Sequence, residues 1–162
     1  MIQPRQVLLS IGSNIEPIHQ RVNQALDFLA TNVLTDAIVS PWYSTPPLGY
    51  TQQNTFVNVA MVGYSTSTPH ELHLAVKGLE VSLGRVHREL WREREIDIDI
   101  ILIGQEIVSN LMLSIPHPRF RTRRFVLQPA ADIAPDLIDP VSGFSISQLL
   151  ALCPDSSVLT PL

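Results

Sequence analysis

The sequence predicts an α+β fold, with a ferredoxin-like split βαβ core in which helices pack on an antiparallel sheet. Two observations carry this prediction. Segments in which every second residue is apolar alternate with segments of helical apolar spacing, in the order strand, helix, strand, strand, helix, strand. The chain also has 162 residues, of which 45% are hydrophobic, enough for one core. We therefore expect a single domain over residues 1–162.

Strand and helix signals alternate in the first half of the chain. Gln6–Ser10 predicts a buried strand, and Pro17 stands near the first turn of the helix that follows. Ala37–Tyr43 and Phe56–Tyr64 predict two further strands, which we expect to pair with each other. The segment Thr45-Pro46-Pro47-Leu48-Gly49 lies between them and predicts a rigid turn, because two prolines fix φ.

The clearest helix start in the chain is at Thr68. Thr68 can serve as N-cap, Pro69 occupies the first helical position and Glu71 completes a capping box. Gly84 is placed to end this helix. Ile96–Ile103 then alternates as a strand with isoleucines on one face.

Residues 104–162 are less regular. Prolines predict turns at positions 116, 118, 129 and 135. A short helix is expected near Ser145–Leu152.

Composition excludes several classes of protein. A net charge of −4 argues against nucleic-acid binding. We expect no membrane span, since the apolar runs are short and broken by charges. We expect no secretory signal, since the N-terminal residues lead directly into a strand pattern without a small-residue cleavage site. Cys153, the single cysteine, cannot form an internal disulfide, which suits a reducing compartment. We therefore expect a cytoplasmic protein.

Positive charge is concentrated in one part of the chain. Residues 85–124 contain eight of the eleven basic residues, and all eight are arginine. Guanidinium groups suit bidentate recognition of phosphate, whereas a solvated charged loop is the alternative explanation.

Asp97 and Asp99 are the strongest chemical signal. Alternate residues of a strand share a face, so both carboxylates point away from the isoleucine core, with Cα atoms about 6.5–7 Å apart. This spacing suits hard cations that also bind substrate phosphates. The alternative is the solvated face of a half-exposed strand.

Other features are weaker. No Walker A pattern occurs, so any use of ATP lies outside the P-loop class, and Gly12-Ser13-Asn14 is interpreted as an ordinary turn. His117 lies between two prolines that hold its backbone, although in isolation a structural role explains it better. Trp91 lies in a charged loop, and two explanations are equally good. Either its ring is a lid that stacks on a flat ligand, or it simply packs against the loop. Phe56 and Asn58 face the same way on one strand, which suggests contact with a heterocycle.

With these residues in view, the chain closely resembles the 6-hydroxymethyl-7,8-dihydropterin pyrophosphokinase family of folate biosynthesis. The matching stretches span roughly nine-tenths of the chain and are Gly12-Ser13-Asn14, YSTPPLG (43–49), FVN (56–58), LGRV (83–86), IDIDI (96–100), IPHP (115–118) and RRFVLQP (123–129). The resemblance implies a ferredoxin-like pyrophosphokinase domain that uses ATP and two Mg²⁺ ions. Its products would be AMP and the pterin pyrophosphate.

The resemblance also implies roles for individual residues. Metal ligands would be Asp97 and Asp99, and the catalytic group would be Arg94, Asp97, Asp99 and His117. ATP would contact Arg85, Arg88, Arg94, Ser114, His117 and Arg123, and the backbone of Ile100. The pterin would contact Thr45, Pro46, Leu48, Phe56, Asn58, Trp91, Asp97 and Phe125. No residue stands out as a general base.

One departure from the family pattern concerns Glu95, where relatives often have threonine. If the strand extends this far, Glu95 shares a face with Asp97 and Asp99, and Glu95→Thr should raise the magnesium requirement. The alternative is that Glu95 pairs with Arg92 or Arg94. The loop before it is also one residue shorter than a common version, which affects the role carried over to Arg88.

Two other functions are consistent with parts of the sequence. One is a non-catalytic nucleotide-sensing module, against which the intact aspartate pair argues. The other is a nucleotide-sugar transferase with an Asp-x-Asp metal site, for which the chain is short. The expected partners are ATP and the pterin alcohol, with no nucleic acid or membrane, in a monomer or weak homodimer.

Overall fold

The computed structural model describes residues 2–47, 49 and 51–162. Its strands are β1 (Arg5–Ser13), β2 (Thr35–Val39), β3 (Tyr43–Thr45), β4 (Phe56–Ser65), β5 (Asp97–Ile103), β6 (Val108–Ser109), β7 (Ser114–Ile115) and β8 (Thr160–Pro161). Its α-helices are α1 (Ile18–Asn32), α2 (Pro69–Ser82), α3 (Arg124–Ile133) and α4 (Ile146–Leu152), with a 3-10 turn at Phe120–Thr122.

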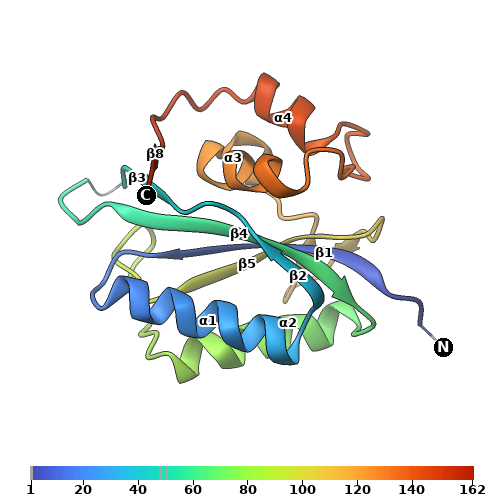
Figure 1. The fold of residues 1–162 in the computed structure, drawn as a ribbon, viewed down its shortest axis with the longest axis horizontal. Coiled ribbons are helices and arrows are strands. Elements are labelled where there is room, and N and C mark those ends of the chain that lie inside the picture. Colours follow the sequence, from blue (N-terminus) through green and yellow to red (C-terminus); the bar gives the residue numbers. More distant parts are fainter. Residues whose placement is uncertain (1, 48, 50) are drawn as a thin grey trace.

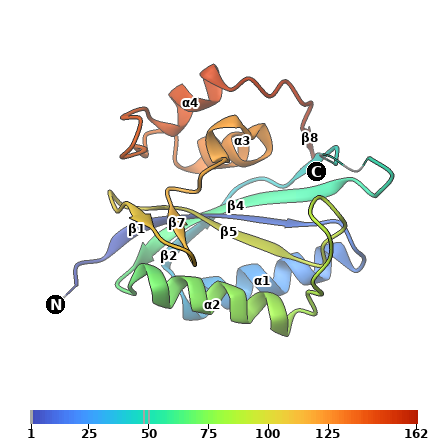
Figure 2. The same ribbon diagram turned by 180° about the vertical axis from the view of Figure 1, so that it is seen from behind.

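The main sheet is antiparallel. Its order is β5-β1-β4-β3-β8, and β2 also pairs with β4, which leaves β5 as an outermost strand. Helices α1 and α2 cover one face, whereas α3 and α4 cover the other (Figures 1 and 2). The predicted packing of helices on an antiparallel sheet is confirmed.

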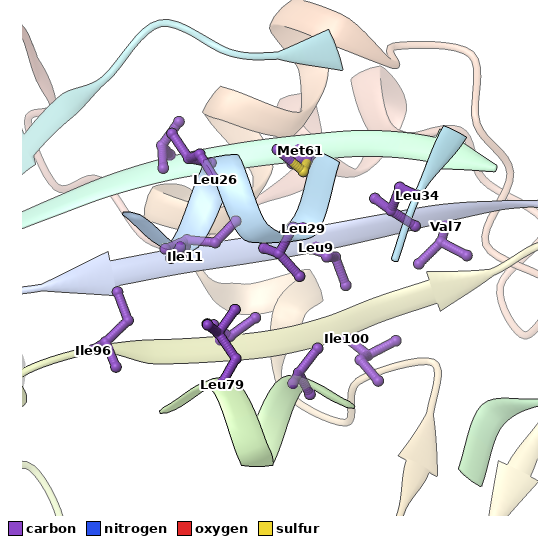
Figure 3. Packing of buried hydrophobic residues seen from close by; sticks show 14 of the residues in the cluster. Val7, Leu9, Ile11, Leu26, Leu29, Leu34, Met61, Leu79, Ile96 and Ile100 are labelled. Carbon is purple, nitrogen blue, oxygen red and sulfur yellow. The ribbon is translucent and has the colours of Figure 1, made fainter. Parts of the chain in front are cut away.

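A hydrophobic core lies on each face of the sheet. Alternate residues of β1 and β5 meet α1 and α2 on one side, including Val7, Leu9, Ile11 and Ile100 (Figure 3). Ile98 belongs to the same cluster. On the other side, Leu8, Ile101 and Leu102 meet α3 and α4. Because both faces of the central strand β1 are buried, Val7, Leu8 and Leu9 are consecutive apolar residues.

The predicted start of α2 is confirmed in detail. Thr68 accepts the backbone N–H of Glu71, and the Glu71 carboxylate accepts the N–H of Thr68. The helix ends before Gly84, which has φ +91° and donates its N–H to Val81.

The strand predicted at 37–43 is divided in two. Pro41 has no N–H, and the hydroxyl of Ser40 accepts the N–H of Ala60, so the chain leaves β2 after Val39 and resumes as β3. Both pieces still pair with β4, as expected.

The turn predicted at Pro129 is wrong, because Pro129 lies inside α3. A proline within a helix lacks one hydrogen bond and costs about 3 kcal/mol. Here Val126, Leu127 and Ala130 are buried against the sheet, and this packing offsets the cost. The short late helix is confirmed as α4, which Ser145 caps.

Among the described residues, no helix combines the length and the hydropathy that crossing a bilayer requires.

Candidate active site

A cavity of about 270 Å³ opens beside the first half of β5, near the lower end of volumes typical for small-ligand sites. Its charged and ionisable lining residues come from α2, β5 and the segments that precede β5 and α3, and are Lys77, Arg85, Arg92, Arg94, Asp97, Asp99, His117, Arg119 and Arg123, with Ser10 of β1 beside them. The remaining lining residues are Gly12, Thr45, Pro46, Phe56, Asn58, Leu90, Trp91 and Phe125. Charged groups therefore meet a partly aromatic surface.

Asp97 and Asp99 point away from the isoleucine core and into this cavity. Their cross-strand neighbours on β1 are small, since Gly12 lies opposite Asp97 and Ser10 lies opposite Asp99. On the far side of Gly12 the register continues to Asn58 of β4. Asp97, Gly12 and Asn58 therefore lie side by side on the neighbouring strands β5, β1 and β4.

Arginine side chains surround Asp97. Its Oδ1 atom is 2.8 Å from Nη1 of Arg85 and 3.4 Å from Nη1 of Arg94. Burial alone would lower the pKa of Arg85, but the charges of Asp97 and Glu80 raise it, so this arginine stays protonated.

The ionised form of Asp99 is disfavoured by its surroundings, whereas Asp97 is paired with arginines. Burial, together with the charge of Asp97, raises the pKa of Asp99 to about 7. Two neighbouring carboxylates offer the hard oxygen donors that Mg²⁺ prefers, and a cation between them would relieve this repulsion. The donor set therefore fits magnesium. Within the part of the chain that the structure describes, no group of three or more His, Cys, Asp and Glu side chains is arranged to hold a metal ion, so the candidate ligands are the aspartate pair alone.

His117 is fixed at the free edge of β5. Its backbone N–H donates to Ile101, and its Nδ1 accepts the N–H of Arg119 at 3.1 Å. Burial and the nearby charge of Arg123 lower the pKa of His117 to about 4. The neutral ring therefore carries its proton on Nε2, which lies 3.7 Å from Oδ2 of Asp99. This N–H can be donated to a phosphate oxygen.

Aromatic rings and guanidinium groups form the opposite wall. The guanidinium of Arg123 lies 5.8 Å from the Trp91 ring centre and 5.6 Å from that of Phe125. Arg119 also lies 5.8 Å from the Trp91 ring. These distances fit cation–π contacts. Arg123 and Phe125 stand at the beginning of α3, so this helix places both of them.

Asn58 is oriented by its two neighbours. Its Nδ2 donates to Oγ1 of Thr45 at 2.7 Å, and its side chain is almost fully buried. A Cβ at Gly12 would lie 2.7 Å from Oδ1 of Asn58, too close for any side chain. Gly12 is therefore glycine because the amide occupies that space.

Ser13 and Asn14 hold the segment that enters β5. Ser13 donates its hydroxyl to the carbonyl of Glu95 at 2.6 Å, and Asn14 exchanges backbone and side-chain hydrogen bonds with Arg94. Asn14 also donates to Gln53 and to the carbonyl of Asn54. The interpretation of Gly12-Ser13-Asn14 as an ordinary turn is wrong for Gly12 and Ser13, which belong to β1 and pair with β4. It also missed the connection to two other loops, because those partners are distant in sequence.

Three described residues that the resemblance singled out are not in the cavity lining. Arg88 instead donates two hydrogen bonds to the carboxylate of Glu95. Ile100 has its side chain in the core, and Ser114 is exposed in the β6–β7 hairpin. Leu48 lies outside the described residues.

No sequence pattern placed Lys77, Glu80 or Arg119 at the site, and Arg92 was expected only as one of two candidate partners of Glu95. Glu80 is buried and bonds to Arg85 and to the N–H of Ile98. A signal was available, since Glu80 follows Val76 by four residues and so continues the apolar stripe of its helix.

Comparison with known proteins identifies the family of the chain. Residues 8–135 match the family described as "7,8-dihydro-6-hydroxymethylpterin-pyrophosphokinase (HPPK)". The chain belongs to this family. The HPPK relative from Pseudomonas aeruginosa is 37% identical over 95% of this chain and 94% of its own length. A relative from Methylorubrum extorquens is 36% identical over 93% of this chain and 94% of its own length. Both carry the name "2-amino-4-hydroxy-6-hydroxymethyldihydropteridine pyrophosphokinase".

Solved HPPK structures share the fold. A crystal structure of "HPPK-DHPS in complex with substrates" superposes on 93% of this chain with a TM-score of 0.71 and 14% identity. A Plasmodium falciparum HPPK-DHPS structure superposes with a TM-score of 0.73 at 15% identity over 94% of this chain. This chain spans less than half of either longer protein, 43% and 46% respectively. The predicted ferredoxin-like α+β fold is confirmed.

Proposed function

We propose that the chain is an ATP-dependent pyrophosphokinase of folate biosynthesis. It transfers the pyrophosphoryl group of ATP to 6-hydroxymethyl-7,8-dihydropterin and releases AMP. Family membership supports the reaction. The observation that carries the assignment to this site is the cavity itself, in which Asp97 and Asp99 face arginines on one side and an amide with aromatic rings on the other. We further propose one pyrophosphokinase domain over residues 1–162, acting in the cytoplasm as a monomer or weak homodimer.

In this proposal the charged half of the cavity binds the triphosphate. Arg94 and Arg123 would contact its oxygens, and neutral His117 would donate its Nε2 proton to one of them. Asp97 and Asp99 would hold two magnesium ions, which supply positive charge to the phosphates when bound. Phosphoryl transfer of this kind depends mainly on positioning and charge stabilisation.

The other half of the cavity would hold the pterin. Asn58, oriented by Thr45, presents an amide to the hydrogen-bonding edge of the ring. Trp91, Phe56 and Phe125 supply surfaces on which a flat heterocycle can stack. The pterin hydroxymethyl oxygen then attacks the β-phosphorus, and the bond from this phosphorus to the α-phosphate oxygen breaks. The hydroxyl proton is released and AMP leaves.

An assay of products tests this function. The purified protein is incubated with ATP, magnesium and the pterin alcohol, and nucleotides are separated by chromatography. We expect AMP and pterin pyrophosphate in equal amounts, and no ADP. Nucleotide binding without any AMP would favour a sensing module instead, and ADP would indicate transfer of a single phosphoryl group.

The same assay tests the aspartates. Asp97→Ala and Asp99→Ala should each lower kcat at least about 100-fold, as removal of a main charge-stabilising group does. Both should remain folded, because neither side chain enters the isoleucine core. Asp136→Ala, at an exposed carboxylate outside the cavity, is the matched control. Near-normal turnover of either variant with magnesium present would contradict the metal assignment.

A further inference from the structure

Glu80 is a buried carboxylate for which the proposed reaction has no direct use. It lies near the end of α2 and is only 3% exposed. A carboxylate in such a position is costly unless charges and hydrogen bonds compensate it. The partners of Glu80 therefore indicate why the fold keeps a charge there.

The first partner is the backbone between the two aspartates. The N–H of Ile98 donates to Oε1 of Glu80 at 2.7 Å. Ile98 separates Asp97 from Asp99 on β5, an outermost strand of the sheet. A strand at the edge presents backbone groups without a neighbouring strand to bond them. Glu80 thus ties the position of this peptide group to α2.

The second set of partners is two cations of the cavity. Nη1 of Arg85 lies 2.7 Å from Oε1 of Glu80 and 2.8 Å from Oδ1 of Asp97, so one guanidinium joins the two carboxylates. Nζ of Lys77 lies 3.3 Å from the other oxygen of Glu80. Lys77 and Arg85 both line the cavity. One buried side chain therefore contacts two cations and the aspartate strand.

We infer that Glu80 is a positioning residue. Through its hydrogen bond to Ile98 it fixes the position of the aspartate pair on β5. Through its ion pairs it orients Lys77 and Arg85 to bind the triphosphate. Glu80 does not line the cavity and touches no substrate itself. This inference rests on the proposed function for the identity of the triphosphate. The contacts that support it are independent of the reaction.

Two substitutions separate the role of the negative charge of Glu80 from that of its side-chain length. Glu80→Gln keeps the length of the side chain and an oxygen that can accept from Ile98, but loses the charge that holds Lys77 and Arg85. Glu80→Asp keeps the charge, but one methylene less prevents it from reaching Ile98 and Arg85 together. Val76→Ala, in the apolar stripe of the same helix, is the control for simple destabilisation.

Kinetics give the first measurement. We expect both Glu80 variants to lower kcat about 10- to 100-fold, which is the usual effect of losing a residue that orients the side chains in direct contact with metal or substrate. The KM for ATP should rise in Glu80→Gln, while the KM for the pterin stays within twofold of the wild-type value. Val76→Ala should lower the melting temperature without this separation of the two KM values. Wild-type kinetics in both Glu80 variants, or losses that merely follow the melting temperature as in the control, would overturn the inference.

Amide hydrogen exchange at Ile98 gives a measurement that needs no substrate. We expect exchange at least tenfold faster in Glu80→Asp and near the wild-type rate in Glu80→Gln. An unchanged rate in Glu80→Asp would show that the hydrogen bond to Ile98 does not hold the strand. If wild-type protein releases no AMP, the proposed function fails, whereas exchange at Ile98 and binding of a non-hydrolysable ATP analogue still test Glu80.

Discussion

The side chain of Glu95 acquires its role from its partner. Its carboxylate accepts hydrogen bonds at 2.8 and 2.6 Å from Arg88, and another from the N–H of Val86. These bonds, led by those from Arg88, lower the pKa of Glu95 to about 2. Strand β5 begins only at Asp97, so the alternation expected to bring Glu95 onto the cavity face does not reach it. The partner is Arg88, where the sequence suggested Arg92 or Arg94.

This pairing changes what Glu95→Thr should do. We expect no change in the magnesium concentration for half-maximal rate, since a carboxylate already paired with an arginine adds little charge to the cavity. Instead, the substitution should free Arg88 for ATP. Arg88→Ala should then raise the KM for ATP about tenfold in the Glu95→Thr background, the effect of one charge-assisted hydrogen bond, and less than about twofold in the wild type.

Steady-state kinetics of the four proteins in this double-mutant cycle provide the test. Equal effects of Arg88→Ala in both backgrounds would mean that Glu95 does not withhold Arg88 from the nucleotide. A higher magnesium requirement in Glu95→Thr would restore the interpretation of Glu95 as a third carboxylate of the site.

At the scale of elements, the loop between α2 and β5 is anchored where it enters β5, whereas its middle is exposed. Ser13 and Asn14 hold residues 94 and 95 by hydrogen bonds. Farther along, the carbonyl of Trp91 accepts from Gln53, which belongs to the loop between β3 and β4 at the same end of the sheet (Figures 1 and 2). Trp91 has φ +68°, an unfavourable value for a residue with a side chain, and is 37% exposed.

We expect Trp91 to become buried when both substrates are bound, which would exclude water from the transfer. In a Trp42→Phe background, Trp91 fluorescence should shift to the blue and resist acrylamide quenching only with the pterin and a non-hydrolysable ATP analogue together. Trp91→Ala should raise the pterin KM about tenfold or more, because stacking on a flat base is worth about 1–3 kcal/mol.

The Trp91→Phe protein, which retains Trp42, should show none of this fluorescence change. The lid hypothesis fails if Trp91 emission ignores both ligands, added singly or together.

At the scale of the whole molecule, the site depends on layers on both faces of the sheet. Helix α2 brings Lys77 and Glu80 to the edge of β5, and α3 brings Arg123 and Phe125 from the opposite layer. The layer that contains α3 and α4 includes one fully buried carboxylate, Asp139. It accepts two hydrogen bonds from Arg121 and one from the hydroxyl of Ser142.

This ion pair predicts a pH dependence of stability. Burial alone would raise the pKa of Asp139, but the bonds from Arg121 and Ser142 lower it to about 2, below the ordinary value of 3.8. A depressed pKa in the folded state adds stability above pH 4 and loses it as the pH falls towards 2. Asp139→Asn should lower the free energy of unfolding at pH 7 by about 3 kcal/mol, the lower end for a broken buried pair, since Arg121 is partly exposed.

Urea unfolding of the wild type and Asp139→Asn between pH 7 and pH 3 measures this difference. We expect it to be constant above pH 5 and to shrink below pH 4, while Asp136→Asn stays close to the wild type throughout. A difference that does not change between pH 5 and pH 3 would show that the ionised form of Asp139 is not the stabilising one.

The sequence alone determined the features whose physics is local. Period-2 alternation placed Asp97 and Asp99 opposite the isoleucine core, and the capping residues located the start of α2 to the residue. The order of strands and helices was sufficient for the fold class. These signals lie within a few residues of one another, so no knowledge of packing is required to interpret them.

Tertiary structure decided which distant groups meet. Pro129 stays in a helix because the buried face of α3 offsets the lost hydrogen bond, and Arg88 bonds to Glu95 while Arg85 joins Asp97 to Glu80. Ten arginines can each find several acids in a chain with this composition, and local spacing does not choose among them. The choice follows from burial, because a carboxylate removed from water is stable only beside the cation that the fold brings to it.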